Sequence, residues 1–485
     1  MENNGEPVKL KTARTLKWNS IDRFSTQILY AAVGIVLANV LSQSDFGIVG
    51  VILIFQAFAI LFVDSGFGAA LLQKKHPDQA DYSTVFWFNL ITGTFIYAIL
   101  WFCAPWIAEL FGSEELVPLS RVMFLTFIIN GLGIVQTNRL MKRMDVKMIA
   151  VSNIVSLTVS GAAGIILALR GYGAWALVWQ SVIQATVKSG WLWITGGWRP
   201  SLVFSRRSLH DVLRIGTGVF SSSFLNTVCL NIYSFIIGAF YALPTLGVYT
   251  QADKWSKMGT ASLSQIFTAT FVPLLSGYQD DREKFRSVIG KINRMSAFMV
   301  FPFMGGLIVA GEPIFHTLFG DKWDSAISLF QILCGRGIFL IFTSLYSNYI
   351  LSLGKARSLV AVELVKDILL VCAIFATIGF RSIEALVWGQ FISAAVTYCF
   401  ALYMSSRLSG KGILPMLSDL APYALLSGLI MCLLCLVPYF GFSAAITLIL
   451  ECVAGLSIYY TVLRISGSKI LNEAQSYLFG RFKRK

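Results

Sequence analysis

The stretch Arg214–Met258, which reads RIGTGVFSSSFLNTVCLNIYSFIIGAFYALPTLGVYTQADKWSKM, repeats features from the beginning of the chain. A shift of 200 positions places Ile35–Val49 on Phe235–Tyr249, and both segments contain an apolar helix end, a short turn, a glycine and a new helix. A second echo follows in the same order, because Ala176–Trp179 recurs as Ala385–Trp388. Two echoes at nearly one offset predict a duplicated unit of about 200 residues.

The composition indicates a membrane protein. Of the 485 residues, 56% are hydrophobic and only 13% are charged, which is about half the charged fraction of a soluble domain. The net charge of +14 would also fit a nucleic-acid-binding protein. The Lys and Arg residues, however, flank long apolar runs, as they do in membrane proteins. We therefore predict an all-α polytopic membrane protein without a nucleic-acid partner.

A membrane-spanning helix needs about 20 mostly apolar residues. We expect about fourteen such helices, at residues 19–42, 47–73, 83–108, 116–138, 148–169, 173–195, 214–241, 247–275, 288–311, 325–352, 357–379, 383–405, 418–439 and 442–464. The predicted organisation is a cytoplasmic arm (1–18), an N-lobe of six helices (19–195), a cytoplasmic linker (196–213), a C-lobe of six helices (214–405), two further helices (418–464) and a basic amphipathic cytoplasmic tail (465–485).

The basic residues also predict the orientation, because short cytoplasmic segments hold most of the Lys and Arg in membrane proteins. With the N-terminus inside, 29 of the 39 Lys and Arg residues fall in cytoplasmic segments. The outside loops hold only Arg170, Lys322 and Arg381. Both termini are therefore expected in the cytoplasm. The tail is expected to lie along the inner membrane surface, and the alternative is a disordered end.

Seven basic residues fall inside the predicted helices and away from their cytoplasmic ends: Arg23, Arg121, Lys188, Lys254, Lys257, Arg336 and Lys366. An unpaired charge at the bilayer centre costs at least about 2.5–3.5 kcal/mol, so these groups need a wet cavity, an ion pair or a path to the surface. Arg121 lies near a helix end, and Lys366 lies near Glu363 and Asp367, so both have structural explanations. The candidate substrate-binding residues are the other five: Arg23, Lys188, Lys254, Lys257 and Arg336.

The duplication suggests where these candidates could meet. If the two repeats pack around an axis along the membrane normal, their first two helices line a central cleft. Arg23 from one half and Lys254 and Lys257 from the other would make this cleft positive. Ammonium and guanidinium donors suit an anionic group such as a diphosphate.

Other candidate groups give weaker signals. Asp64 and Glu451, inside predicted helices, are candidates for ion coupling, and buried structural roles are the alternative. No metal site or cofactor is expected: the Cys432–Cys435 stretch has metal-ligand spacing but lacks a second pair and a nearby histidine, and no phosphate-binding G-x-x-x-x-G-K-[ST] loop occurs. The three histidines are isolated from one another and no nucleophile motif accompanies them, so we do not expect an enzyme.

Several motifs have a familiar form. They are Thr15–Trp18, Leu37–Ser42, Asp45–Val49, Asp64–Leu71 and, in the second half, Leu246–Tyr249 followed by Gln251–Lys254. The sequence resembles bacterial polysaccharide flippases of the Wzx type, in the multidrug/oligosaccharidyl-lipid/polysaccharide (MOP) exporter superfamily. The likeness covers most of the first twelve predicted helices.

This resemblance implies a fold and a function. The fold would be two pseudo-symmetric six-helix lobes around a central cavity, with two C-terminal helices added. The protein would move an undecaprenyl-diphosphate-linked oligosaccharide across the bacterial cytoplasmic (inner) membrane by alternating access, for surface polysaccharides such as lipopolysaccharide. Lipid flippases of this superfamily use cavity Arg and Lys residues on the first and eighth helices, and Arg23 and Lys254 match those placements. The expected partners are the lipid-linked glycan, the lipid bilayer and other polysaccharide assembly proteins.

Two alternatives remain open at this stage. A drug/cation antiporter of the same superfamily, resembling multidrug and toxin extrusion (MATE) transporters, should have a cavity dominated by carboxylates. A membrane polymerase or ligase for the same glycans should have a large outside loop with catalytic Arg or His. The longest outside loop expected here, Glu312–Asp324, has only thirteen residues.

Overall fold

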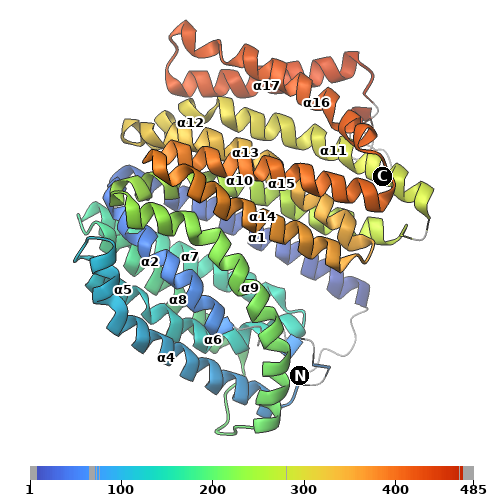
Figure 1. The fold of residues 1–485 in the computed structure, drawn as a ribbon. Coiled ribbons are helices and arrows are strands. Elements are labelled where there is room, and N and C mark those ends of the chain that lie inside the picture. Colours follow the sequence, from blue (N-terminus) through green and yellow to red (C-terminus); the bar gives the residue numbers. More distant parts are fainter. Residues whose placement is uncertain are drawn as a thin grey trace. The chain divides into compact units, whose positions relative to one another are not determined.

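The computed structural model describes residues 8–64, 71–72, 74–75, 77–279, 281–468 and 470–472. Within these ranges the regular elements are helices, and no strand occurs (Figure 1). The helices of the first half are α1 (Val8–Val40), α2 (Gln43–Asp64), α4 (Gln79–Leu110), α5 (Leu116–Met123), α6 (Leu125–Lys142), α7 (Val146–Leu169), α8 (Ala174–Gly196) and α9 (Arg206–Phe240). Those of the second half are α10 (Leu243–Ser276), α11 (Arg282–Val309), α12 (Gly311–Leu318), η1 (Asp321–Trp323), α13 (Asp324–Ser352), α14 (Ala356–Thr377), η2 (Ile378–Phe380), α15 (Ile383–Ser409), α16 (Ile413–Leu434), η3 (Val437–Phe440) and α17 (Ala444–Ile465).

The prediction of an all-α, multi-pass membrane protein is confirmed. Each of the fourteen predicted segments overlaps a helix, and twelve spans in the described ranges are long and apolar enough to cross a membrane. The two helices that do not reach this standard are α8 and α14. Polar groups explain the difference, because α8 carries Lys188 among other polar residues and α14 carries Glu363, Lys366 and Asp367. The count of fourteen therefore stays a prediction.

Contacts divide the chain into two units, Met1–Thr250 and Gln251–Lys485. In the first unit, α7 packs against α1 and α8, and α2 packs against α9. Small residues let α7 approach its neighbours, since Gly161 faces Val33 of α1 and Gly164 faces Gln180 of α8. The unit boundary at Thr250 lies beyond the predicted linker, 196–213, because α9 packs on α2 and α4. The predicted six-helix lobes stay a prediction.

The two segments that resemble each other in the sequence contact each other at the first turns of α2 and α10. A methyl group added at Gly47 would overlap the backbone carbonyl of Leu243, and one added at Gly247 would overlap the carbonyl of Gln43. The contact is thus reciprocal, and each residue of one pair lies 200 positions from its counterpart in the other. Such a contact is what a duplicated unit with approximate twofold symmetry produces. Only glycine leaves room for two backbones this close.

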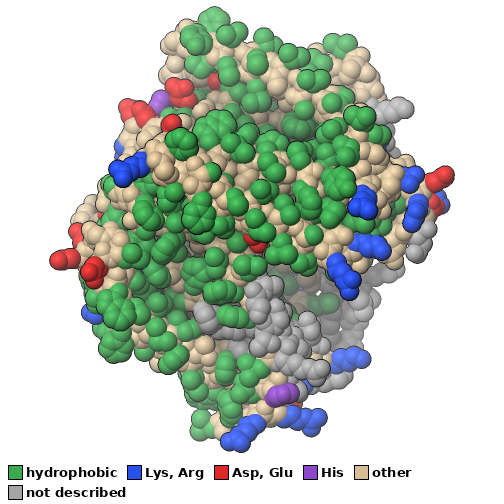
Figure 2. Space-filling model, in the orientation of Figure 1, with side chains coloured by type: hydrophobic (Ala, Val, Ile, Leu, Met, Phe, Trp, Pro, Cys, Tyr) green, Lys and Arg blue, Asp and Glu red, His purple; other side chains and the backbone are tan. Residues whose placement is uncertain are grey.

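In the second unit, α13 packs against α15, α14 against α15, and α11 against α16. The outward faces of α14 and α15 expose apolar side chains, including Leu364, Phe375 and Ile392, as the green surface there shows (Figure 2). These faces suit contact with lipid. Ion pairs join α16 to α11, because Arg294 Nη1 lies 2.5 Å from Asp419 Oδ1 and Lys411 also pairs with Asp419. The predicted tail, 465–485, lies outside the described residues from 473 onward.

Candidate functional site

Two of the five candidate basic residues belong to the first unit. Arg23 is exposed on α1, and Lys188 is partly buried on α8. Next to Arg23, both carboxylate oxygens of Asp22 accept hydrogen bonds from Asn153 Nδ2, at 3.2 and 3.1 Å. These hydrogen bonds join α1 to α7 one residue away from Arg23, and Lys188 lies on α8, which also packs against α7.

The other three candidates belong to the second unit, and two of them meet around a buried carboxylate. Asp253 Oδ2 lies 2.5 Å from Lys257 Nζ, and Asp253 Oδ1 lies 3.7 Å from Arg336 Nη1. The same nitrogen of Arg336 donates a hydrogen bond of 2.6 Å to Gln390 Oε1. We call Asp253, Lys257, Arg336 and Gln390 the Asp253 cluster. It joins α10, α13 and α15.

Lys254 is next to the Asp253 cluster in the chain. Its side chain is partly buried, and its ammonium lies 5.2 Å from the ring centroid of Trp255. Lys254, Lys257 and Arg336 together carry three positive charges, whereas the cluster has one carboxylate. Because Gln390 orients the guanidinium of Arg336, the fork of N–H donors is held in place. The arrangement can bind an anionic group by charge-assisted hydrogen bonds.

A polar groove lies between α13 and α14 in the same unit. Its volume is about 290 Å³, and Thr343, Ser347, Asn348, Glu363 and Lys366 are among its lining residues. The hydroxyls of Thr343 and Ser347 have no hydrogen-bond partner in the described chain. Such a groove offers donors and acceptors to a polar molecule inside a bundle of membrane helices.

The two acidic candidates differ in what the structure describes. Asp64 is the last residue of α2, and its side chain lies outside the described part. Glu451 lies on α17 and is only 3% exposed. Its two carboxyl oxygens have no hydrogen-bond partner. The buried location is as expected, whereas the hydrogen-bonded structural alternative for Glu451 finds no support in the described contacts.

The local neutralisation expected for Lys366 is confirmed, whereas the expected reach of Arg121 to the outer membrane surface stays a prediction. The guanidinium of Arg121 lies 4.5 Å above the ring of Trp101. The ammonium of Lys366 pairs with Glu363, and Asp367 lies 4.0 Å away. Both charges therefore have local partners.

Sequence reasoning missed the anionic and amide members of these sites. Asp253 is not among the candidates from the sequence, although its i,i+4 spacing to Lys257 is the spacing of a helical ion pair. That spacing could have revealed the pair. No sequence signal connects Asp22 with Asn153, or Arg336 with Gln390, because each pair comes from helices distant in the chain.

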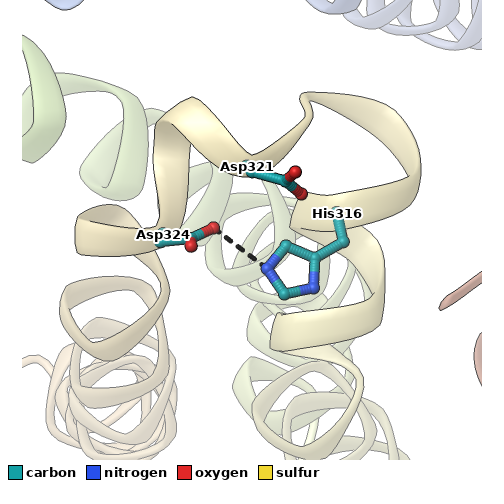
Figure 3. Close-up of side chains that lie close together, drawn as sticks. All are labelled: His316, Asp321 and Asp324. Carbon is teal, nitrogen blue, oxygen red and sulfur yellow. Dashed lines mark hydrogen bonds and ion pairs between the residues drawn. The ribbon is translucent and has the colours of Figure 1, made fainter. Parts of the chain in front are cut away.

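One group of potential metal ligands lies where the end of α12, η1 and the start of α13 meet. His316 Nε2 and Asp324 Oδ1 are 2.9 Å apart, and Asp321 lies beside them (Figure 3). Each of the three residues has one potential ligand atom that lies within 4.8 Å of those of the other two. The His316–Asp324 pair accounts for the closest of these contacts by joining the end of α12 to the start of α13. Sequence reasoning had described the histidines as isolated from one another and did not find this grouping.

Comparison with known proteins identifies the family. A family model described as polysaccharide biosynthesis protein matches residues 36–328, which is more than half of the chain. The chain belongs to this family. The match covers residues 36–195 of the predicted N-lobe and the cluster residues Asp253 and Lys257. It reaches α13 only at its start and does not include Arg23.

Curated relatives agree with the polysaccharide biosynthesis family. The teichuronic acid biosynthesis protein TuaB of Bacillus subtilis is 24% identical over 393 residues, covering 80% of this chain and 81% of TuaB. The succinoglycan biosynthesis transport protein ExoT of Rhizobium meliloti is 25% identical and covers 80% and 79%. The lipopolysaccharide biosynthesis protein WzxC of Escherichia coli is 25% identical and covers 68% and 67%. The resemblance to Wzx-type proteins is therefore confirmed.

Solved structures place this family member in a known fold. The lipid II flippase MurJ in an inward closed conformation matches with a TM-score of 0.73 at 14% identity, covering 92% of this chain and 98% of MurJ. An inward-facing MATE multidrug transporter of the MOP superfamily matches with a TM-score of 0.61 at 17% identity, covering 82% and 99%. At these identities the likeness concerns the fold, which is the fold that the sequence predicted.

Proposed function

We propose that this protein moves an undecaprenyl-diphosphate-linked oligosaccharide from the inner to the outer leaflet of the bacterial inner membrane by alternating access. Membership of the polysaccharide biosynthesis family supports this proposal. The relatives are named for three different surface or secreted polysaccharides, and one of them is named as a transport protein. Because the three polysaccharides differ, a transport step that they share explains the similarity of these proteins better than a sugar that they share. In this role the protein is a transporter and not an enzyme.

The observation that carries the proposal is the basic character of polar sites on membrane helices. In the second unit Lys254, Lys257 and Arg336 outnumber the single carboxylate of Asp253, and in the first unit α1 and α8 carry Arg23 and Lys188. An excess of positive charge on membrane helices is costly unless an anion binds it. A diphosphate supplies that anion, so we assign Lys254, Lys257 and Arg336 of the second unit to the diphosphate and keep Arg23 and Lys188 of the first unit as candidates for contact with the substrate.

The sugar part of the substrate needs a polar surface as well. Glycan hydroxyls cannot enter hydrocarbon without hydrogen-bond partners. The groove between α13 and α14 supplies hydroxyl, amide and charged groups in a volume of about 290 Å³. We assign this groove to part of the oligosaccharide, while the prenyl chain stays in lipid.

The membrane potential can drive this movement. An anionic group that moves outward across an inside-negative membrane gains about 2.3 kcal/mol per charge per 100 mV. The proposal places both termini in the cytoplasm, following the distribution of Lys and Arg, so the substrate is loaded on the inner side. Asp64 and Glu451 remain candidates for ion coupling in addition to this potential.

The competing functions fit the charges less well. A transporter for cationic drugs would place its substrate against Lys254, Lys257 and Arg336, which would repel it. A polymerase or ligase would need a catalytic domain outside the membrane, whereas α12 and α13 are joined by only a short segment that contains η1. We therefore prefer a flippase for an anionic lipid-linked glycan.

Reconstituted protein tests the proposed substrate contact. Vesicles with the protein and an undecaprenyl-diphosphate-linked oligosaccharide should show transfer of the glycan between leaflets, measured with a glycan-binding probe added outside. In Lys254→Gln the rate should fall about tenfold or more, because a hydrogen bond to a charged group contributes about 1.5–3 kcal/mol.

Lys284→Gln is the matched control, because it removes the same charge from α11 at an exposed pair with Asp281, 3.1 Å away. This control should keep the wild-type rate. Equal rates for Lys254→Gln, Lys284→Gln and wild type would contradict the assignment of Lys254 to the substrate.

A further inference from the structure

A cavity next to the two C-terminal helices contains a buried acid that the proposed transport does not require. The cavity has a volume of about 240 Å³ and lies between α11, α12, α16 and α17. Contacts hold these four helices together within the second unit (Figure 1). The lining is mostly apolar, and Glu451 is its one charged residue.

Two polar side chains that line this cavity lack hydrogen-bond partners in the described chain. Both carboxyl oxygens of Glu451 and the hydroxyl of Ser427 are buried and form no hydrogen bond in the described chain. The other hydroxyl in the lining belongs to Tyr459, which already donates a hydrogen bond of 3.0 Å to the carbonyl of Phe298. A buried carboxylate without a partner is unfavourable. Glu451 and Ser427 therefore leave polar atoms in the lining that a hydrogen-bond donor from outside the chain can satisfy.

The cavity is reachable from the surface that faces lipid. Leu456 and Phe303 line it and are 70% and 44% exposed. Cys452, which follows Glu451 in the chain, also lines it and is exposed. A molecule dissolved in the membrane can thus enter between α11 and α17 without crossing a polar barrier.

The chemistry of the lining selects the class of ligand. A bound metal cation such as Ca²⁺ requires about six to eight oxygen ligands, and this lining offers too few. An ammonium group on a hydrocarbon chain fits both the polar atoms and the apolar lining of the cavity. The ammonium can donate hydrogen bonds to Glu451 and Ser427, while the hydrocarbon chain contacts the apolar wall. We propose that this cavity is a binding site for an amphiphilic cation, with Glu451 as the counter-ion. This proposal does not rest on the proposed glycan transport, and it gives Glu451 a role other than ion coupling.

Protection of Cys452 from alkylation tests this site in the full-length protein. The protein is placed in nanodiscs of phosphatidylcholine and treated with N-ethylmaleimide in the presence of octylamine or octanol, which share the alkyl chain and differ in charge. Peptide mass spectrometry follows Cys452, and the exposed Cys399 on α15 serves as the internal control. We expect octylamine to slow the reaction of Cys452 at about tenfold lower concentration than octanol, because a hydrogen bond to a charged group is worth at least that factor. The rate at Cys399 should not change.

The variant Glu451→Gln keeps the shape of the side chain and removes the charge. In this variant octylamine should protect Cys452 no better than octanol does. Cys399 should react as in wild type, which would show that the fold is retained. Equal protection by the two compounds in wild-type protein would overturn the proposal and leave Glu451 as a buried protonated acid. The same preference for octylamine in Glu451→Gln, or no protection by either compound, would also overturn it.

Discussion

Replacing Gly47 by alanine is expected to abolish export of the glycan and to destabilise the first unit. The added methyl group would overlap the backbone carbonyl of Leu243, and a backbone cannot move aside as the end of a side chain can. Overpacking of this kind costs about 1–3 kcal/mol. Gly247→Ala should have the same effect, because it meets the carbonyl of Gln43 in the mirrored position. Thermal unfolding of purified protein measures the loss.

Two further variants test whether the loss of stability comes from the contact between the two backbones. Gly190→Ala on α8 adds a methyl group to a helix where no atom lies within 4 Å, so its stability should equal or slightly exceed that of wild type. The double variant Gly47→Ala, Gly247→Ala should lose less than the sum of the single losses, because both changes push apart the same contact. Wild-type stability of Gly47→Ala would show that the two turns do not touch.

Replacing Arg336 by methionine is expected to stop export and to lower the free energy of unfolding. The variant loses the hydrogen bond to Gln390 and the approach to Asp253. Losing a hydrogen bond to a charged group costs about 1.5–3 kcal/mol, partly because the buried amide of Gln390 is left without this donor. For Arg336→Lys, both export and the free energy of unfolding should lie between those of wild type and Arg336→Met, since an ammonium cannot reproduce the fork of a guanidinium.

A second substitution separates the structural role of Arg336 from its role toward substrate. In Arg336→Met, Gln390→Leu both partners become apolar, which can be nearly neutral for stability. This double variant should recover much of the unfolding free energy, while export should stay below about a tenth of wild type, as expected for loss of a charged hydrogen bond. Recovery of export together with stability would show that Arg336 serves the fold alone.

The sequence predicted the fold well because membrane helices are specified by local composition. Runs of apolar residues, broken by short turns and flanked by Lys and Arg, were sufficient to predict an all-α membrane protein and an overlap of every predicted segment with a helix. The ambiguity concerns α8 and α14, whose polar residues lower their hydropathy. The predicted duplication retains glycine at positions 47 and 247, where a backbone carbonyl lies too close for a side chain, whereas Gln43 and Leu243 differ because only their backbone takes part in the contact.

The candidate site was predicted less completely. The cost of placing Arg336 and Lys257 in membrane helices singled out both residues, but the partners that stabilise them come from other positions. Gln390 lies 54 residues from Arg336, and no local pattern connects them. Asp253 was detectable from its helical spacing to Lys257, whereas the cavity at Glu451 depends on how α11, α12, α16 and α17 pack. Local composition therefore finds the charges, and the tertiary structure supplies their partners.

The most direct test of the central proposal is the leaflet in which the lipid-linked oligosaccharide accumulates in cells that lack this protein. A membrane-impermeant glycan-modifying reagent, applied to intact cells and to inverted vesicles, distinguishes the two leaflets. The account predicts accumulation in the inner leaflet, relieved by wild-type protein but not by a normally inserted Arg23→Ala, Lys254→Ala variant. If the oligosaccharide reaches the outer leaflet without the protein and only chain growth fails, the protein is not the flippase, and a polymerase or ligase function takes its place.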